Sequence, residues 1–205
     1  DFLRYHNTCG SFELVHALAN FNATNHYMVS VFADFNGDGA LDILATRFRV
    51  WSRLYLNNGN GTFRDVTSGV GFTSVDIMGH NVADLDMDGY PEILLGTGHS
   101  ASVQKDIMYL TTPVGNFVQA LNFSTQSKIN SKGLTRSHGS AIGDLNGDLY
   151  PDTYFCNGGP SSYPNSNGTN SLFMSQKTAN HVLRVTATGT LSNRFGIGAN
   201  VSVFL

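Results

Sequence analysis

The nonapeptide Asp34-Phe35-Asn36-Gly37-Asp38-Gly39-Ala40-Leu41-Asp42 carries an oxygen-bearing side chain at positions 1, 3, 5 and 9. This spacing, with a glycine at position 6, wraps a short loop around one hard cation. Calcium takes about six to eight oxygen ligands and tolerates irregular geometry. We therefore predict a calcium loop whose ligands are the side chains of Asp34, Asn36, Asp38 and Asp42 and the carbonyl of Ala40.

The same pattern occurs twice more along the chain, at residues 84–92 and 144–152. The predicted ligands are Asp84, Asp86, Asp88, Tyr90 and Glu92 in the second loop and Asp144, Asn146, Asp148, Tyr150 and Asp152 in the third. The three loops hold ten of the 15 Asp and Glu residues of the chain. So much like charge in tight loops is destabilising unless a cation neutralises it, which argues against ordinary polar turns. The pattern predicts up to three bound Ca²⁺ ions.

These loops differ from EF-hands, which need a glutamate at position 12 and a helix on each side. Position 12 is Ala45, Leu95 or Phe155 here. The flanking residues alternate as in strands, for example Val29-Ser30-Val31-Phe32 before the first loop. Each loop is therefore predicted at the tip of a β-hairpin.

Four strand-like segments recur with a period of 50–60 residues. The first segment precedes each acidic loop, at 29–33, 80–83 and 140–143, and the second follows it, at 41–46, 93–96 and 153–156. The third segment lies at 54–56, 107–110 and 172–174. The fourth begins at Phe12, Phe63 and Phe117. Four short strands per period are typical of a β-propeller blade. We predict an all-β fold, a partial β-propeller with repeats at 28–77, 78–137 and 138–179, preceded at 1–27 by the end of another blade and a linker.

Composition limits the classes of function. The chain has 205 residues, of which 41% are hydrophobic and 13% charged, enough for one domain with a sizeable core and part of another. No basic run suggests a nucleic-acid partner. No apolar stretch approaches the about 18 residues of a membrane span.

Several features favour an extracellular or cell-surface location. Calcium loops of weak affinity suit the millimolar calcium found outside cells. Sequons for N-glycosylation occur at Asn22, Asn60, Asn122, Asn167 and Asn200, and Asn60 is the best candidate because it lies in a glycine-rich turn. The two cysteines, Cys9 and Cys156, leave pairing open. The chain has no initiator Met, so its start looks processed or cut.

Two stretches resemble known families. The run Gly59-Asn60-Gly61-Thr62-Phe63-Arg64-Asp65-Val66-Thr67, the loops and the period resemble FG-GAP/VCBS repeats, and integrin α-type propellers use similar hairpin calcium loops. The tail, with Asn180-His181-Val182-Leu183-Arg184-Val185 and the run 189–199, resembles the start of an ASPIC/UnbV-type domain, as in cartilage-acidic-protein-like secreted proteins. The resemblance implies calcium binding, an extracellular setting, no catalytic residues, and the start of a second β domain at 180–205.

Two departures from the pattern rank the loops. Leu149 occupies position 6 of the third loop, where the other loops have glycine, and a left-handed backbone there would be strained. Glu92 at position 9 of the second loop is one methylene longer than Asp. We therefore expect the first loop to bind calcium best and the third to bind it least well.

The sequence contains no motif that predicts an enzyme. His80 and His138 precede acidic loops at different offsets, so they do not form a repeated ligand position and are interpreted as structural. No His-x-x-x-His or Gly-x-Ser-x-Gly motif occurs. Trp51 and Tyr55 are interpreted as packing or surface residues, with the stacking of a glycan ring as the alternative.

We expect an extracellular calcium-binding module for adhesion, binding or structural assembly, with a protein, a glycan or other copies of itself as partner. One variant is a protomer of a surface filament or matrix. The alternative is a non-catalytic accessory domain of a larger secreted enzyme. The chain begins inside one repeat and stops in the strand-like run 201–205, so we expect the rest of its own chain or another copy to cover its open ends.

Overall fold

A computed structural model describes most residues of the chain. They are residues 3–8, 11–16, 27–72, 76–98, 106–112, 117–122, 136–158, 170–176, 178, 180, 182–190, 193–196 and 201.

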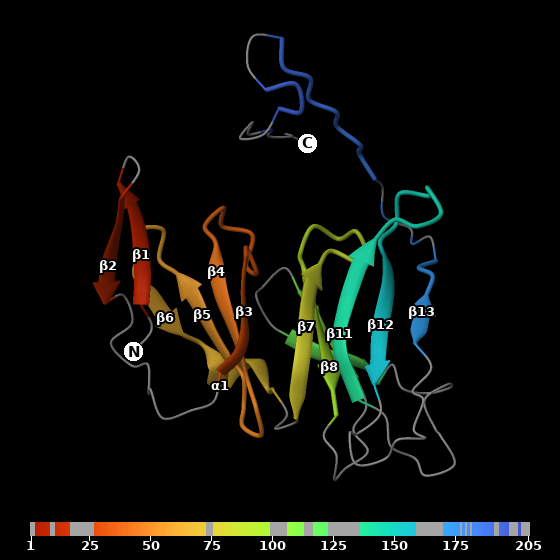
Figure 1. The fold of residues 1–205 in the computed structure, drawn as a ribbon, viewed down its shortest axis with the longest axis horizontal. Coiled ribbons are helices and arrows are strands. Elements are labelled where there is room, and N and C mark those ends of the chain that lie inside the picture. Colours follow the sequence, from red (N-terminus) through yellow and green to blue (C-terminus); the bar gives the residue numbers. More distant parts are fainter. Residues whose placement is uncertain are drawn as a thin grey trace.

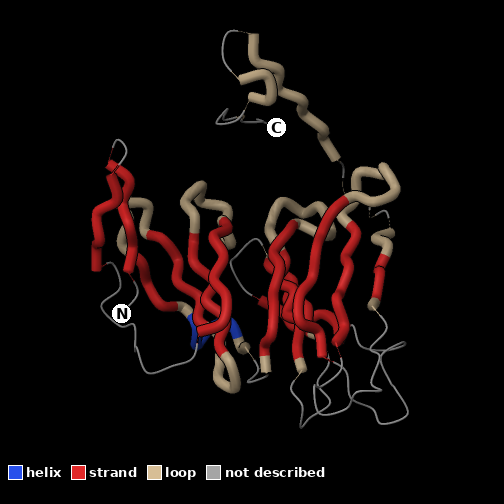
Figure 2. Tube along the Cα trace, viewed as in Figure 1, coloured by secondary structure: helices blue, strands red, loops and turns tan. Residues whose placement is uncertain are grey.

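Antiparallel sheets dominate the structure (Figures 1 and 2). The first sheet, in the order β3-β4-β5-β6, contains β3 (Tyr27–Ala33), β4 (Asp42–Arg47), β5 (Arg53–Asn57) and β6 (Phe63–Asp65). The second contains β7 (Ile77–Ala83), β8 (Glu92–Thr97), β9 (Ile107–Thr111) and β10 (Phe117–Asn122). The third contains β11 (Arg136–Gly143), β12 (Asp152–Gly158) and β13 (Ser171–Phe173), while β1 (Leu3–Thr8) and β2 (Ser11–His16) form a separate hairpin.

The predicted all-β class is confirmed, and the sheets repeat one pattern. Equivalent residues pair between the second and third strand of each sheet: Ile43 with Tyr55, Ile93 with Tyr109, and Thr153 with Phe173. The sheets lie side by side in Figure 1, in the order of their sequence. The described strands form no closed ring, so the β-propeller stays a prediction.

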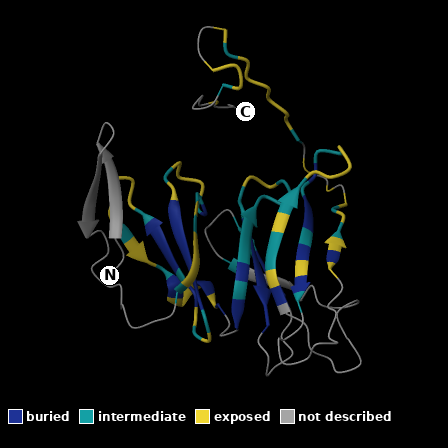
Figure 3. Cartoon of the chain, in the orientation of Figure 1, coloured by how far each residue is buried: buried dark blue, intermediate teal, exposed yellow. Residues whose placement is uncertain are grey.

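The main core lies between the first two sheets (Figure 3). All six residues of β4 and all six of β8 are buried, because these central strands are covered on both faces. The cluster joins side chains of both sheets: Phe35, Leu44, Leu54, Leu56, Val70, Phe72, Ile77, Ile93, Leu95, Ile107 and Tyr109. Burying each large side chain contributes about 1.5–3 kcal/mol. In the first two sheets, the strand that follows the acidic loop is thus anchored in the core.

Glycines let the second and third sheets approach closely. A Cβ atom on Gly79 would lie 2.8 Å from the carbonyl oxygen of His138, and one on Gly96 would lie 3.1 Å from that of Ser137. Polar contacts also cross this boundary, since Ser137 Oγ lies 2.8 Å from Asp106 Oδ2. Larger residues at the two glycines would push β11 away from β7 and β8.

One short helix, α1 (Thr67–Val70), follows β6. The carboxylate of Asp65 accepts the backbone N–H of Thr67 at 2.9 Å, and the helix ends at Gly71, which has a left-handed φ of 69°. Val70 and Phe72 then enter the main core. No described helix is long and apolar enough to cross a membrane.

The described residues of the tail, 180–205, lie in no strand. The N–H of Gly189 donates to the carbonyl of Arg194 at 3.2 Å, and Leu183, Val185 and Phe195 are exposed. Figure 1 shows the tail leaving the sheets on the side where the acidic loops lie. A β domain at 180–205 therefore stays a prediction.

Candidate metal centres

The three acidic loops lie at the tips of the first hairpin of each sheet, along one edge of the structure (Figure 1). At the base of each loop the two strands end in a pair of residues that lie opposite each other in the antiparallel sheet. These pairs are Ala33 with Asp42, Ala83 with Glu92, and Gly143 with Asp152. The prediction that the loops are hairpin tips is confirmed.

The carboxylate at position 1 organises each loop from within. Asp34 Oδ1 accepts the N–H of Gly37 at 2.8 Å, and Asp34 Oδ2 accepts the N–H of Gly39 at 2.8 Å. Asp144 accepts the N–H of Gly147 at 2.7 Å and that of Leu149 at 3.0 Å. Asp84 accepts the N–H groups of Asp88 and Gly89 at 3.1 and 2.9 Å. A carboxylate that accepts several N–H groups holds a tight turn.

Two positions in each loop adopt left-handed backbone. At position 6, φ is 84° for Gly39, 94° for Gly89 and 74° for Leu149, so the strain expected at Leu149 is present. At position 4, φ is 72° for Gly37, 61° for Met87 and 77° for Gly147. The requirement at position 4 was missed in the sequence, although a glycine there in two of three loops signals it. A left-handed non-glycine residue costs about 1–2 kcal/mol, so the second and third loops each carry one strained residue and the first carries none.

The side chains at positions 1, 3 and 5 converge. In the second loop, Asp84, Asp86 and Asp88 each place one carboxylate oxygen within 4.8 Å of the others. Burial raises the pKa of Asp86, and the neighbouring carboxylates of Asp88 and Asp84 raise it further. The cluster therefore holds like charges that a cation would stabilise.

In the first and third loops an asparagine occupies position 3. Asn36 Nδ2 donates to Asp38 Oδ2 at 2.8 Å, and Asn146 Nδ2 donates to Asp148 Oδ2 at 3.0 Å. The N–H of Ala40 and the Asn36 amide lower the pKa of Asp38. These amide groups stabilise the neighbouring carboxylate by hydrogen bonding. The second loop has a third carboxylate in place of the amide, so its like charges repel most strongly.

The acid at position 9 is buried at the base of each loop, where it also has a structural role. Asp42 Oδ2 accepts the N–H of Phe35 and Asp42 Oδ1 that of Asn57, both at 2.8 Å. Asp152 accepts the N–H groups of Leu145 and Ser175, both at 2.9 Å. Burial raises the pKa of Asp42, and Asp38 and Asp34 add to the effect. This residue ties its loop to the third strand while remaining near the other predicted ligands.

Glu92 departs from that arrangement. Its Oε2 accepts the N–H of Leu85 at 2.7 Å, and the backbone N–H of Thr111 also acts on this carboxylate and lowers its pKa, but no hydrogen bond of normal length reaches the buried Oε1. Burial raises the pKa of Glu92 to about 7, and the charges of Asp86 and Asp88 contribute. An unpartnered buried carboxylate oxygen is unfavourable, and a bound cation would satisfy it. The residues of the second loop therefore fit a hard divalent cation.

The residue at position 7 donates its backbone N–H within its own loop, and in the second and third loops its side chain also contacts residues outside that loop. The N–H groups of Ala40, Tyr90 and Tyr150 donate to the position 5 carboxylates at 2.8, 2.8 and 3.0 Å. The ring of Tyr90 lies against the first loop, since a Cβ atom on Gly37 would be 2.9 Å from its Cε1. This contact between the second and first loops was missed in the sequence, where an aromatic residue at position 7 is the only signal.

Residues after β13 join the third loop to the second. The Tyr150 hydroxyl donates to the carbonyl of Asn180 at 3.2 Å. Asn180 Nδ2 and Thr178 Oγ1 then donate to the carbonyl of Asp86 at 2.9 and 3.0 Å. The three loops thus form one connected row, and the start of the tail is part of it.

The remaining candidates lie away from the loops. Asn60 is exposed in the turn between β5 and β6, and Cys156 is also exposed. Asn122 ends β10. Cys9 and the sequons at Asn22, Asn167 and Asn200 lie outside the described residues.

The histidines and aromatic residues that were weighed as catalytic or glycan-binding groups have distinct environments. His80 Nδ1 lies 3.1 Å from Thr46 Oγ1, and burial lowers the pKa of this imidazole to about 4. His138 is exposed on β11. Trp51 is exposed, whereas Tyr55 is buried.

One comparison with known proteins bears on these loops. A family model described as an FG-GAP-like repeat matches residues 34–95, from the first ligand of the first loop to Leu95 in β8. The chain thus carries an FG-GAP-like repeat, as its sequence resemblance predicted, and such repeats often bind calcium. No curated protein matches the chain.

Proposed function

We propose that this chain is an extracellular calcium-binding β-propeller module that serves in adhesion, binding or structural assembly. The observation that carries the proposal is the convergence of Asp84, Asp86 and Asp88, whose carboxylate oxygens lie within 4.8 Å of one another in a loop whose framework recurs at Asp34 and Asp144. Such a concentration of hard oxygen ligands suits Ca²⁺.

In this proposal each loop would hold one ion through the side chains at positions 1, 3, 5 and 9 and the carbonyl at position 7. The ions would supply positive charge where the acids repel one another. Neutralising that repulsion would hold the hairpin tips rigid and, through Tyr90 and Asn180, fix the row of loops. The role is structural, and we propose no catalytic step.

Separate observations support the propeller fold, the extracellular setting and the C-terminal domain in this proposal. Side-by-side four-stranded sheets support a propeller. The exposed sequon residue Asn60 and the weak-affinity type of loop support an extracellular setting. The resemblance of the tail supports an ASPIC/UnbV-type domain beginning at about residue 180. The partner would be a protein, a glycan or another copy of the chain.

Thermal unfolding with excess calcium and with a chelator tests calcium binding. At a calcium concentration of 100 Kd, one site stabilises by about 2.7 kcal/mol, which raises Tm by about 5–10 °C in a chain of this length. Asp88→Ala should reduce this calcium-dependent shift, because it removes the carboxylate that all three loops carry at position 5. Asp65→Asn, an acid of the first sheet outside the loops, should leave the shift unchanged. Equal Tm values with calcium and with chelator would refute the metal sites.

Sedimentation tests self-assembly separately. A chain that assembles through its exposed strand edges should form larger species as its concentration rises. A 22.2 kDa monomer at every concentration, with calcium bound, would contradict that part of the proposal alone.

A further inference from the structure

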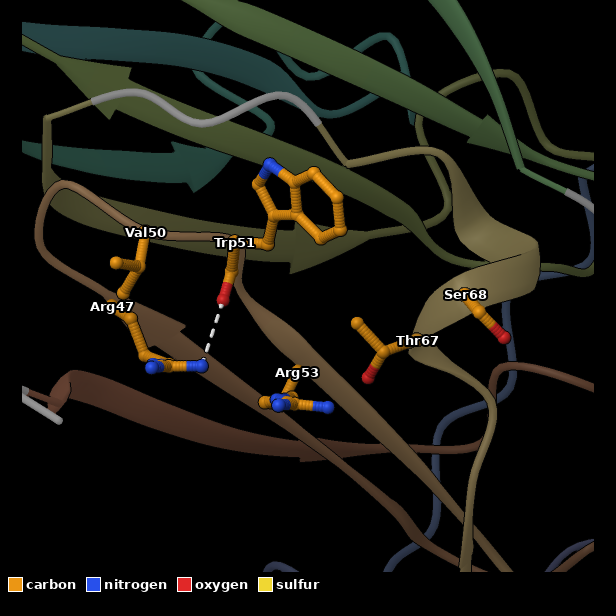
Figure 4. Close-up of a pocket in the computed structure, with 6 residues that line it drawn as sticks. All are labelled: Arg47, Val50, Trp51, Arg53, Thr67 and Ser68. Atoms are coloured by element: carbon orange, nitrogen blue, oxygen red, sulfur yellow. Dashed lines mark hydrogen bonds between the residues drawn. The ribbon is translucent and has the colours of Figure 1, made fainter. Parts of the chain in front are cut away.

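A pocket lies in the first sheet at the end opposite the calcium loops (Figure 4). Because β3 and β4 are joined by the first calcium loop, the connection from β4 to β5 lies at the other end of the sheet. That connection and the start of α1 line a pocket of about 390 Å³, through the side chains of Arg47, Val50, Trp51, Arg53, Thr67 and Ser68. This volume suits a small ligand.

Arg47 is the unusual member of this lining. It is only 5% exposed, and its Nε has no hydrogen-bond partner. Its Nη1 donates a long hydrogen bond of 3.4 Å to the carbonyl of Trp51, and its guanidinium carbon lies 5.4 Å from the centre of the Tyr27 ring. No described carboxylate forms an ion pair with it. A buried cation with only neutral contacts is destabilising unless an anion reaches it.

A second guanidinium lines the same pocket. Arg53 is paired with Asp65 at 2.9 Å, so one of the two charges is balanced inside the protein. In Figure 4 both guanidinium groups lie on one side of the pocket and the indole of Trp51 on the other. The planar guanidinium of Arg47 matches the two oxygens of a carboxylate, which it binds through parallel hydrogen bonds.

The rest of the lining favours a ligand with a flat apolar face and hydroxyl groups. Trp51 is 62% exposed, so its indole is open to a ligand that enters the pocket. Thr67 Oγ1 accepts the N–H of Leu54 at 3.1 Å and keeps its own proton to donate, and the exposed residue Ser68 also lines the pocket. A sugar ring offers a face of C–H groups to the indole and hydroxyls to the polar rim.

An extended peptide fits the pocket less well. Peptides that bind sheets usually pair with a free strand edge. β5, which borders the pocket, is already paired with β4 on one side and β6 on the other. The pocket therefore offers side chains but no free backbone edge.

We propose that this pocket binds a carboxylated sugar of the uronic or sialic acid type, with the carboxylate on Arg47 and the ring face on Trp51. The site is separate from the calcium loops, and its occupation would give the module a glycan partner.

Trp51 is the only tryptophan of the chain, so intrinsic fluorescence reports directly on the pocket. The protein, kept in calcium throughout, is titrated with glucuronic acid, with glucose, which lacks the carboxylate, and with acetate, which lacks the ring. We expect a saturable emission change with glucuronic acid and affinities at least about tenfold weaker for the other two, because each lacks one of the two contacts.

Two variants separate recognition from folding. Arg47→Met should weaken glucuronic acid binding by at least about tenfold while leaving Tm unchanged or higher, because it removes a buried unpaired charge. Arg49→Met makes the same change two residues away, at an arginine that is outside the pocket lining and paired with Asp76, and should leave binding unchanged. If Arg47→Met fails to fold, Arg47→Lys keeps the charge but loses the bidentate fork, and should also weaken binding.

Three results would overturn the proposal. The first is an unchanged Trp51 emission at tens of millimolar glucuronic acid. The second is equal loss of binding in Arg47→Met and Arg49→Met. The third is binding of an aspartate-rich peptide, dependent on Arg47, by a protein that does not bind glucuronic acid, which would make the pocket a site for acidic peptides. Each can occur with the calcium sites intact.

Discussion

Replacing Gly39 with alanine isolates the backbone strain of the first acidic loop. Gly39 has a φ of 84°, and a Cβ atom there would meet nothing within 4 Å, so the substitution adds strain without a clash. A left-handed alanine costs about 1–2 kcal/mol, and the lower entropy of the unfolded alanine chain returns about 0.4–1 kcal/mol. We expect Gly39→Ala to lower the free energy of unfolding by about 1 kcal/mol, measured by urea unfolding in saturating calcium with Trp51 emission as the probe.

Two matched alanine substitutions bracket that value. Gly37→Ala adds the same strain and a contact of 2.9 Å with Tyr90 Cε1, so it should cost about 1 kcal/mol more. Gly143→Ala lies beside the third loop in open space with ordinary backbone, and should be neutral or slightly stabilising. The order of destabilisation is therefore Gly37→Ala, then Gly39→Ala, then Gly143→Ala. A neutral Gly39→Ala, or a Gly143→Ala that is equally destabilising, would refute the reasoning and remove the ground for ranking the third loop below the first.

Three further predictions address the third loop, the link to the tail and the buried imidazole. Leu149→Gly should raise the free energy of unfolding, because it relieves the left-handed φ of 74° in the folded loop; urea unfolding that finds a less stable variant would contradict this. Asn180→Ala removes one donor to the carbonyl of Asp86 and should weaken calcium binding at the second loop about two- to fivefold, whereas Asp65→Asn should not. His80 has its pKa lowered to about 4 in the folded protein, against an ordinary 6.5, so the unfolded chain takes up its proton first. The contribution of His80 to stability should therefore fall as the pH drops from about 6.5 towards 4, by about 1–2 kcal/mol between pH 7 and pH 5, while the raised pKa of Glu92 acts in the opposite direction. The difference in free energy of unfolding between the parent protein and His80→Gln isolates the part due to His80, and a difference that does not change with pH would count against burial as the cause.

The sequence by itself determined the acidic loops, the strands around them and the all-β class. These features are local, because alternating apolar residues define a strand and a spacing of two places ligands around one turn. Local rules also predicted the strain at Leu149, since one backbone conformation recurs at position 6 of all three loops. The FG-GAP-like repeat at 34–95 could be recognised from the sequence because its loops and strands are defined by local spacing.

Only the tertiary structure decided the features that depend on how the sheets pack. The contact of Tyr90 with Gly37 joins loops of neighbouring sheets, and the hydrogen bond from Asn180 to Asp86 spans 94 residues. The unpartnered oxygen of Glu92 and the unpaired charge of Arg47 are likewise properties of burial, which no spacing rule encodes. In the sequence, nothing distinguishes Arg47 from any other arginine at the end of a strand. It becomes a candidate binding group because the fold buries most of its guanidinium over the Tyr27 ring and beside the Trp51 carbonyl without supplying an anion.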